Sequence, residues 1–152
     1  AGAGMGVDAG LPDFRGAQLE NLRVVMECAL PGAIFIDAKM ETASLRDAKL
    51  ADADFSRAQA RAIDLSGADL TRARFYRAFV REGRFVRSTL TDAVMMSVDA
   101  LDALFTGADL TRADFTGANL HGVDFARVKS GTKRLTDALL TRARMYPQRS
   151  TP

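Results

Sequence analysis

The sequence has few of the residues on which disulfides, metal sites and membrane spans depend. Its 152 residues include one cysteine, Cys28, so no disulfide can form within the chain. The one histidine, His121, has neither a second histidine nor a thiol partner, which argues against a metal site. No apolar run approaches the roughly eighteen residues that a membrane-spanning helix needs. The length suits a single domain.

A period of five residues dominates the chain. Every fifth residue from Leu30 to Phe125 is apolar, over twenty successive positions. Two residues before these apolar residues the side chain is small, and alanine fills fourteen of the twenty positions. A period of five matches neither the 3.6-residue period of a helix nor the two-residue period of a strand. The pattern therefore predicts a solenoid whose short unit turns a corner after each repeat.

Residues twenty positions apart are also alike, which predicts four units in each coil. We number the four sides of the coil 1 to 4 by the column of apolar residues behind each. The columns are, in order, Leu30, Leu50, Leu70, Leu90 and Leu110; Phe35, Phe55, Phe75, Met95 and Phe115; Met40, Ala60, Val80, Ala100 and Leu120; Leu45, Leu65, Phe85, Phe105 and Phe125.

The best copies of the unit read Ala, then Asp or Asn, then Leu or Phe, then two variable residues. They are Ala68-Asp69-Leu70-Thr71-Arg72 and the three consecutive units over 108–122. The chain thus resembles the pentapeptide repeat family over residues 28–127. The resemblance implies an all-β fold, a right-handed quadrilateral parallel β-helix of about six to seven coils. Both the central residue and the small residue of each unit would point inward.

The repeat predicts one β-helix over 11–127, a flexible N-terminal segment over 1–10 and a tail over 147–152. Phe14 and Leu19 lie one residue out of phase with Leu30, which predicts a bulge near Val24-Val25.

Residues 128–146 allow two interpretations, interrupted final repeats or an amphipathic capping helix. Ser130 and Lys133 do not suit inward positions, and Gly131 suggests a loop. Residues 140–146 nevertheless copy 70–76 closely, which favours further β-helix.

No group of residues suggests catalysis, so we predict no catalytic, cofactor-binding or metal-binding residue, no cofactor and no enzyme activity. His121 is expected to be solvated and Cys28 to be a buried structural thiol. The acidic residues before the central positions are expected to be solvated side chains. The glycines Gly32, Gly67, Gly107, Gly117 and Gly122 share one repeat position and are expected to serve turns.

Positive charge gathers in the middle of the chain as a basic belt. Only Glu82 opposes it, whereas acidic residues prevail from Asp92 to Asp124. The belt predicts a surface for an acidic protein, an anionic lipid or a nucleic acid. The alternative is that each arginine pairs with an aspartate on the next coil. The belt comprises Arg72, Arg74, Arg77, Arg81, Arg84 and Arg87.

Several apolar residues occupy positions that should point outward, which is typical of a docking surface when the core is already complete. Combined with arginines of the belt, they form our predicted partner-binding set. The set is Ile34, Ile36, Arg74, Tyr76, Arg77, Phe79, Val94 and Met96.

These features favour a non-enzymatic structural or protein-interaction subunit, a scaffold that docks as a rigid rod onto a larger complex. The expected partners are subunits of a protein complex, not a small-molecule substrate or a nucleic acid, with peripheral membrane association through those partners. The resemblance implies one specific candidate, a photosynthetic membrane complex, with a processed mature protein in the chloroplast thylakoid. The alternative is a DNA mimic that regulates a nucleic-acid enzyme such as gyrase, as quinolone-resistance members of the family do. The belt of arginines argues against that alternative.

Overall fold

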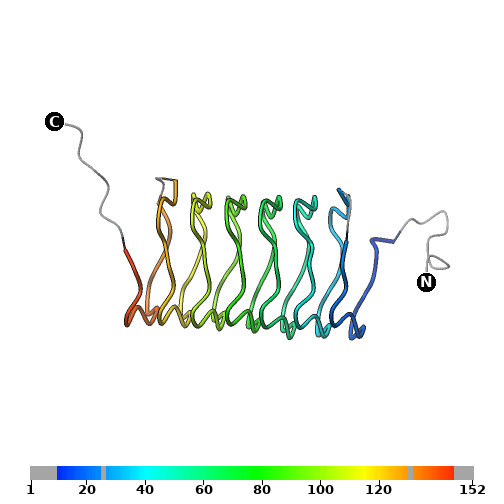
Figure 1. Cartoon of the computed structure of the whole chain (residues 1–152), viewed down its shortest axis with the longest axis horizontal. Helices are drawn as coiled ribbons and strands as arrows, with labels where there is room; N and C mark the ends of the chain where they lie inside the picture. The colour runs from blue at the N-terminus through cyan, green and yellow to red at the C-terminus, as the bar shows by residue number, and fades with distance from the viewer. Residues whose placement is uncertain (1–9, 25–26, 130–131, 146–152) are drawn as a thin grey trace.

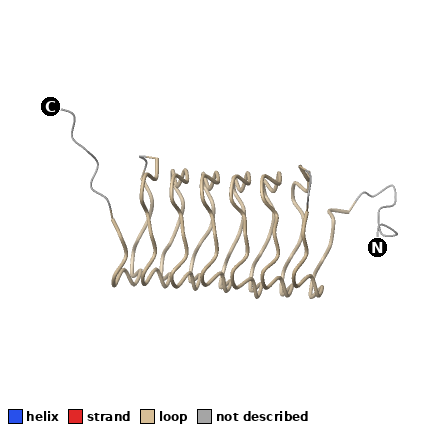
Figure 2. Cartoon of the chain, viewed as in Figure 1, coloured by secondary structure: helices blue, strands red, loops and turns tan. Residues whose placement is uncertain are grey.

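The computed structural model describes residues 10–24, 27–129 and 132–145. The chain forms an elongated stack of coils, with its first and last described residues at opposite ends (Figure 1). Over those ranges there is neither a helix nor a continuous strand, and isolated parallel β-bridges join the coils (Figure 2). The described residues accordingly contain no helix able to cross a membrane.

From Ala29 onward, bridged residues lie twenty positions apart, which gives four five-residue units per coil. On side 2, for example, Arg74 bridges both Asp54 and Val94. The N–H of Arg74 donates to the carbonyl oxygen of Ala53 at 2.9 Å, and its own carbonyl accepts from the N–H of Phe55 at 2.6 Å. Hydrogen bonds of this kind run along the rod and tie each inner coil to the coils before and after it. The expected total of six to seven coils remains a prediction.

Each unit turns its corner over the two residues after the central one. After Leu30, the N–H of Ala33 donates to the Leu30 carbonyl at 3.1 Å, and Gly32 has a φ of 71°. A positive φ at the third residue of a four-residue turn is typical of a type II turn. The glycines at this repeat position serve turns as predicted, yet eighteen of the described residues with positive φ are not glycine, Thr42 and Ala62 among them.

The core is one apolar cluster that fills the centre of the rod. From Ala33 to Phe125 both inward positions of each unit are buried, whereas the inward residues of the first and last coils, such as Leu19 and Leu140, are half-buried. Phe75 is fully buried, and its ring stacks on Phe55 with centroids 4.7 Å apart. It also meets the edge of Phe85 at 5.8 Å. Corner residues such as Ala73 are buried as well, and the same repeat position also accommodates the larger side chains of Ile63 and Val98.

The extra residue expected near the N-terminus is visible as a change of register. Arg23 bridges Ser44, twenty-one positions later, whereas Ala29 bridges Lys49, twenty positions later. The insertion therefore lies between Arg23 and Ala29. The proposed bulge itself falls partly on residues 25–26, outside the described ranges.

Residues 132–145 continue the bridged coils, and the capping helix considered for 133–146 is absent from them. Ser130, Gly131 and Tyr146 lie outside the described residues. Three bridges hold this segment in the register of twenty: Asp114 to Arg134, Asn119 to Leu139, and Asp124 to Arg144.

Lys133 occupies the small inward position that we expected a lysine not to fill. Its side chain is half-buried, and its Nζ lies 5.9 Å from the centroid of the Phe125 ring. The expectation was wrong because a lysine can bury its aliphatic stem and direct its ammonium group at an aromatic face.

Candidate interaction surface

The described residues contain no group of three or more His, Cys, Asp or Glu side chains that could hold a metal ion. His121 belongs to a turn, where its backbone N–H donates to Asn119 Oδ1 at 3.2 Å. Cys28 was expected to be buried, but it is half-buried against the core near the N-terminal end.

We expected the acidic residues before the central positions to be solvated side chains. Instead, they accept hydrogen bonds from the turn that follows them. Asp69 Oδ1 accepts from the N–H of Thr71 at 3.0 Å and from its hydroxyl at 2.6 Å. Asp109 holds Thr111 in the same way, and that hydroxyl hydrogen bond lowers the pKa of Asp109. These carboxylates are half-buried and already satisfied, so they are poor candidates for acid–base chemistry.

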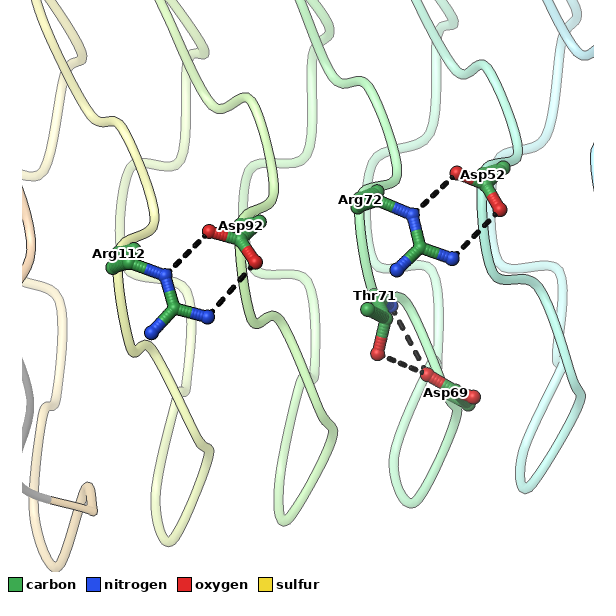
Figure 3. Close-up of polar contacts among 6 residues, drawn as sticks. All are labelled: Asp52, Asp69, Thr71, Arg72, Asp92 and Arg112. Carbon is green, nitrogen blue, oxygen red and sulfur yellow. Dashed lines mark hydrogen bonds and ion pairs between the residues drawn. The ribbon is translucent and has the colours of Figure 1, made fainter.

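Aspartates and arginines alternate along the corner between sides 1 and 2. Arg72 grips Asp52 through two nitrogens, Nε at 2.8 Å and Nη2 at 3.0 Å, and Arg112 grips Asp92 in the same way (Figure 3). The hydrogen bond from each arginine lowers the pKa of its aspartate. Bidentate pairing of this kind fixes the guanidinium against the rod.

Only part of the basic belt is neutralised by such pairs. Arg72 binds Asp52, and Arg81 Nε lies 2.7 Å from Asp99 Oδ2. Over the described residues, the other four arginines form no ion pair. Arg74 and Arg77 belong to side 2, whereas Arg84 and Arg87 belong to side 4, across the coil. The belt is therefore neither wholly paired with aspartates of adjacent coils nor wholly free to bind an anionic partner. Two of its arginines form ion pairs along the rod, and the other four face solvent.

Five residues of the predicted partner-binding set form one continuous surface on side 2, which we call the Tyr76 patch. Arg74 bridges Val94 on the next coil, and the N–H of Arg77 donates to the Met96 carbonyl at 3.1 Å. The Arg77 guanidinium carbon lies 5.3 Å from the centroid of the Tyr76 ring. Both arginines are exposed, and the three apolar side chains are half-buried.

The remaining three residues of the set lie apart from this patch. Asp54 separates Ile34 from Arg74 on the bridge ladder, so Ile34 is two coils, about 10 Å, away. Ile36 belongs to the same early coil as Ile34. Phe79 lies around the corner on side 3, where it bridges Gln59 and Asp99.

Phe79 borders a shallow hollow of about 510 Å³ with Gln59, Ala60, Arg61 and neighbouring residues. Its side chain is 51% exposed. Arg61 is held by Glu82 at 3.0 Å, which keeps its guanidinium at the wall of the hollow. Side 3 therefore offers a separate apolar contact beside the Tyr76 patch.

Comparison with known proteins places these features in a family. Residues 26–59, 53–92 and 94–129 match the family described as pentapeptide repeats, in eight copies. The chain belongs to the pentapeptide repeat family. Its members fold as right-handed quadrilateral β-helices, in agreement with the twenty-residue register of the bridges.

Several solved structures are similar to the chain. QnrB1, a plasmid-mediated fluoroquinolone resistance protein, shares 20% identity with a TM-score of 0.70, over 86% of this chain and 69% of that one. HetL, from the cyanobacterium Nostoc and involved in heterocyst differentiation regulation, shares 23% identity with a TM-score of 0.43, over 88% and 60%. A pentapeptide repeat protein from the Arabidopsis thaliana thylakoid lumen shares 31% identity with a TM-score of 0.41, over 67% and 63%. A search of curated proteins finds no match.

The sequence reasoning missed the carboxylates that cap the turns, and it gave pairing between arginines and aspartates of adjacent coils only as an alternative, without naming the pairs. Asp-x-Thr within a unit marks a carboxylate that caps the following turn, a signal that Asp69 and Thr71 carry in plain form. An aspartate and an arginine twenty positions apart, such as Asp52 and Arg72, mark an ion pair between coils. The first pattern can be recognised within a single unit. The second can be recognised once polar residues twenty positions apart are compared, as the apolar residues were.

Proposed function

We propose that the protein is a non-enzymatic structural or interaction subunit, a rigid rod that docks onto a larger protein complex. The observation that carries this proposal is the Tyr76 patch, where apolar and cationic side chains adjoin over a completed core. Tyrosine and arginine are among the residues that most often dominate binding energy at protein interfaces.

Rigidity supports a scaffold role. The central and corner residues of the middle coils are buried, and hydrogen bonds tie each of those coils to the ones before and after. A surface held in this way loses little conformational entropy when a partner binds. Tyr76 and Met96 occupy turn positions of adjacent coils, so their relative placement is fixed by the backbone.

The charge of the patch indicates the chemistry of the partner. Arg57, one coil before Arg77, is bound to Asp37 at 2.9 Å, but Arg77 has no acidic residue at that distance among the described residues. Arg74 is likewise free to bind a carboxylate on a partner. We therefore propose a partner surface that presents acidic side chains around an apolar centre.

The family resemblance supports a photosynthetic membrane complex as the partner to test first. Affinity capture with the tagged full chain, carried out separately on thylakoid and soluble extracts, tests two claims. These are docking through the Tyr76 patch and the identity of the partner as a photosynthetic membrane complex. Recovery of the same complex from thylakoids by the wild-type chain, with loss in Tyr76→Ala/Arg77→Ala, is the expected result. Recovery that is equal for the folded double variant would contradict docking through the Tyr76 patch.

A further inference from the structure

Along the corner between sides 4 and 1, a row of turn residues has a glycine between an aspartate and an arginine. We call this row a charge ladder that lacks its middle charged residue. Its successive turn residues are Asp47, Gly67 and Arg87. At the corner between sides 1 and 2, an aspartate at this position pairs with an arginine one coil later, as Asp52 does with Arg72. Here Gly67 stands where that arginine would be.

The missing side chain leaves Asp47 and Arg87 without ion pairs among the described residues. A Cβ atom on Gly67 would collide with Asp47 Oδ1, so this carboxylate lies over the glycine. Arg87 lies one coil beyond Gly67 and is exposed, and its Cγ lies over Gly107 of the following coil. Two opposite charges thus lie on either side of a position that has no side chain of its own.

The space between them is a notch of about 310 Å³. Arg46 also lines it, but its Nη1 is bound to Asp64 Oδ2 at 3.1 Å, so that charge is neutralised. Arg84 has no ion pair over the described residues. The charges that remain around the notch are therefore one carboxylate, Asp47, and two guanidinium groups. The full lining is Arg46, Asp47, Ser66, Gly67, Arg84, Val86 and Arg87.

We propose that this notch binds an acidic α-amino acid, a ligand with one ammonium and two carboxylate groups. The ammonium would face Asp47, and the carboxylates would bind Arg84 and Arg87, since guanidinium groups bind carboxylates through paired hydrogen bonds. The methylene groups would lie against Val86. This site is on side 4, across the coil from the Tyr76 patch, and does not depend on the function proposed above.

Titration of the ¹⁵N-labelled full chain with L-glutamate, followed by two-dimensional NMR, tests the assignment. We expect saturable shifts at the amides of Ser66, Gly67 and Arg87. L-glutamine lacks one carboxylate and glutarate lacks the ammonium, so each should bind about tenfold more weakly than L-glutamate. The absence of saturable shifts, or equal affinity for glutamate and glutamine, would overturn the proposal.

The variant Gly67→Arg should abolish the glutamate shifts by restoring the missing member of the ladder. Arginine already occupies this turn position at Arg57 and Arg72, each with a φ of 56°, so the variant should fold. Gly117→Arg, at the same turn position on another corner, is the matched control and should bind normally. Arg87→Gln should also weaken binding, whereas Arg127→Gln should not. Shifts that persist in folded Gly67→Arg would show that glutamate binds elsewhere.

Discussion

At the scale of the residue, Phe75 and Phe79 show that the position within the repeat decides whether a phenylalanine is buried and how much it contributes to stability. They lie in adjacent units, and one is fully buried while the other is 51% exposed. Phe75→Ala should lower the free energy of unfolding by about 3 to 5 kcal/mol, because it opens a cavity in a stacked column. Phe79→Ala should change it by about 0.5 kcal/mol or less. Chemical denaturation of both variants checks this pair, and similar losses would contradict the assignment of inward and outward positions.

The turn residues offer a second contrast. Ala62 has a φ of 57°, a conformation that costs an L-residue about 1 to 2 kcal/mol. Ala62→Gly should relieve that cost, while the greater freedom of glycine in the unfolded chain offsets about 0.4 to 1 kcal/mol of the gain. We expect a net stabilisation of about 0.5 to 1 kcal/mol. Ala51 precedes the positive-φ position of its own turn, so Ala51→Gly should instead destabilise. Thermal unfolding of the two variants compares them, and a loss of stability in both would count against the turn assignment.

At the scale of the element, the corner ladder links stability to pH. Because Arg72 and Arg112 lower the pKa values of Asp52 and Asp92, these carboxylates are more acidic in the folded chain than in the unfolded one. Their contribution to stability is present above the unfolded pKa, near pH 4, and is lost as pH falls through the folded pKa.

Arg72→Met should return the pKa of Asp52 towards its ordinary value. Arg74→Met, two residues away and without an ion pair among the described residues, should leave it unchanged. Carboxyl carbon shifts followed by NMR titration measure both variants. An Asp52 pKa that does not rise in Arg72→Met would contradict the pairing in Figure 3.

Much of the fold was predictable because the repeat fixes the position of each residue. The period of five placed Phe75 and Ala73 inward, and the phase of Phe14 revealed the extra residue near the N-terminus. The polar contacts were harder to predict, since the choice of partner depends on geometry between coils. The half-burial of Lys133 could not be read from residue type, because it depends on how a long side chain lies against the end of the core.

At the scale of the whole molecule, the arrangement of charge argues against a DNA mimic. The bridge ladder of side 2 passes from Asp54 to Arg74, Val94, Asp114 and Arg134 without a continuous acidic row. A mimic of duplex DNA needs closely spaced negative charge along its length. We predict no stoichiometric inhibition of DNA supercoiling by gyrase at physiological salt. A supercoiling assay checks this, and inhibition at equimolar protein would favour the alternative function.

Docking through the Tyr76 patch is the central claim, and the affinity of the captured partner complex for defined variants tests it most directly. Tyr76→Ala/Arg77→Ala should weaken binding by about thirtyfold, or 2 kcal/mol, while circular dichroism shows an intact fold. Val86→Ala/Arg87→Ala alters the equivalent turn on the opposite side of the same coil and should bind as the wild type does. Equal affinity of the folded Tyr76 variant and the wild type, or an equal loss in both variants, would contradict the claim.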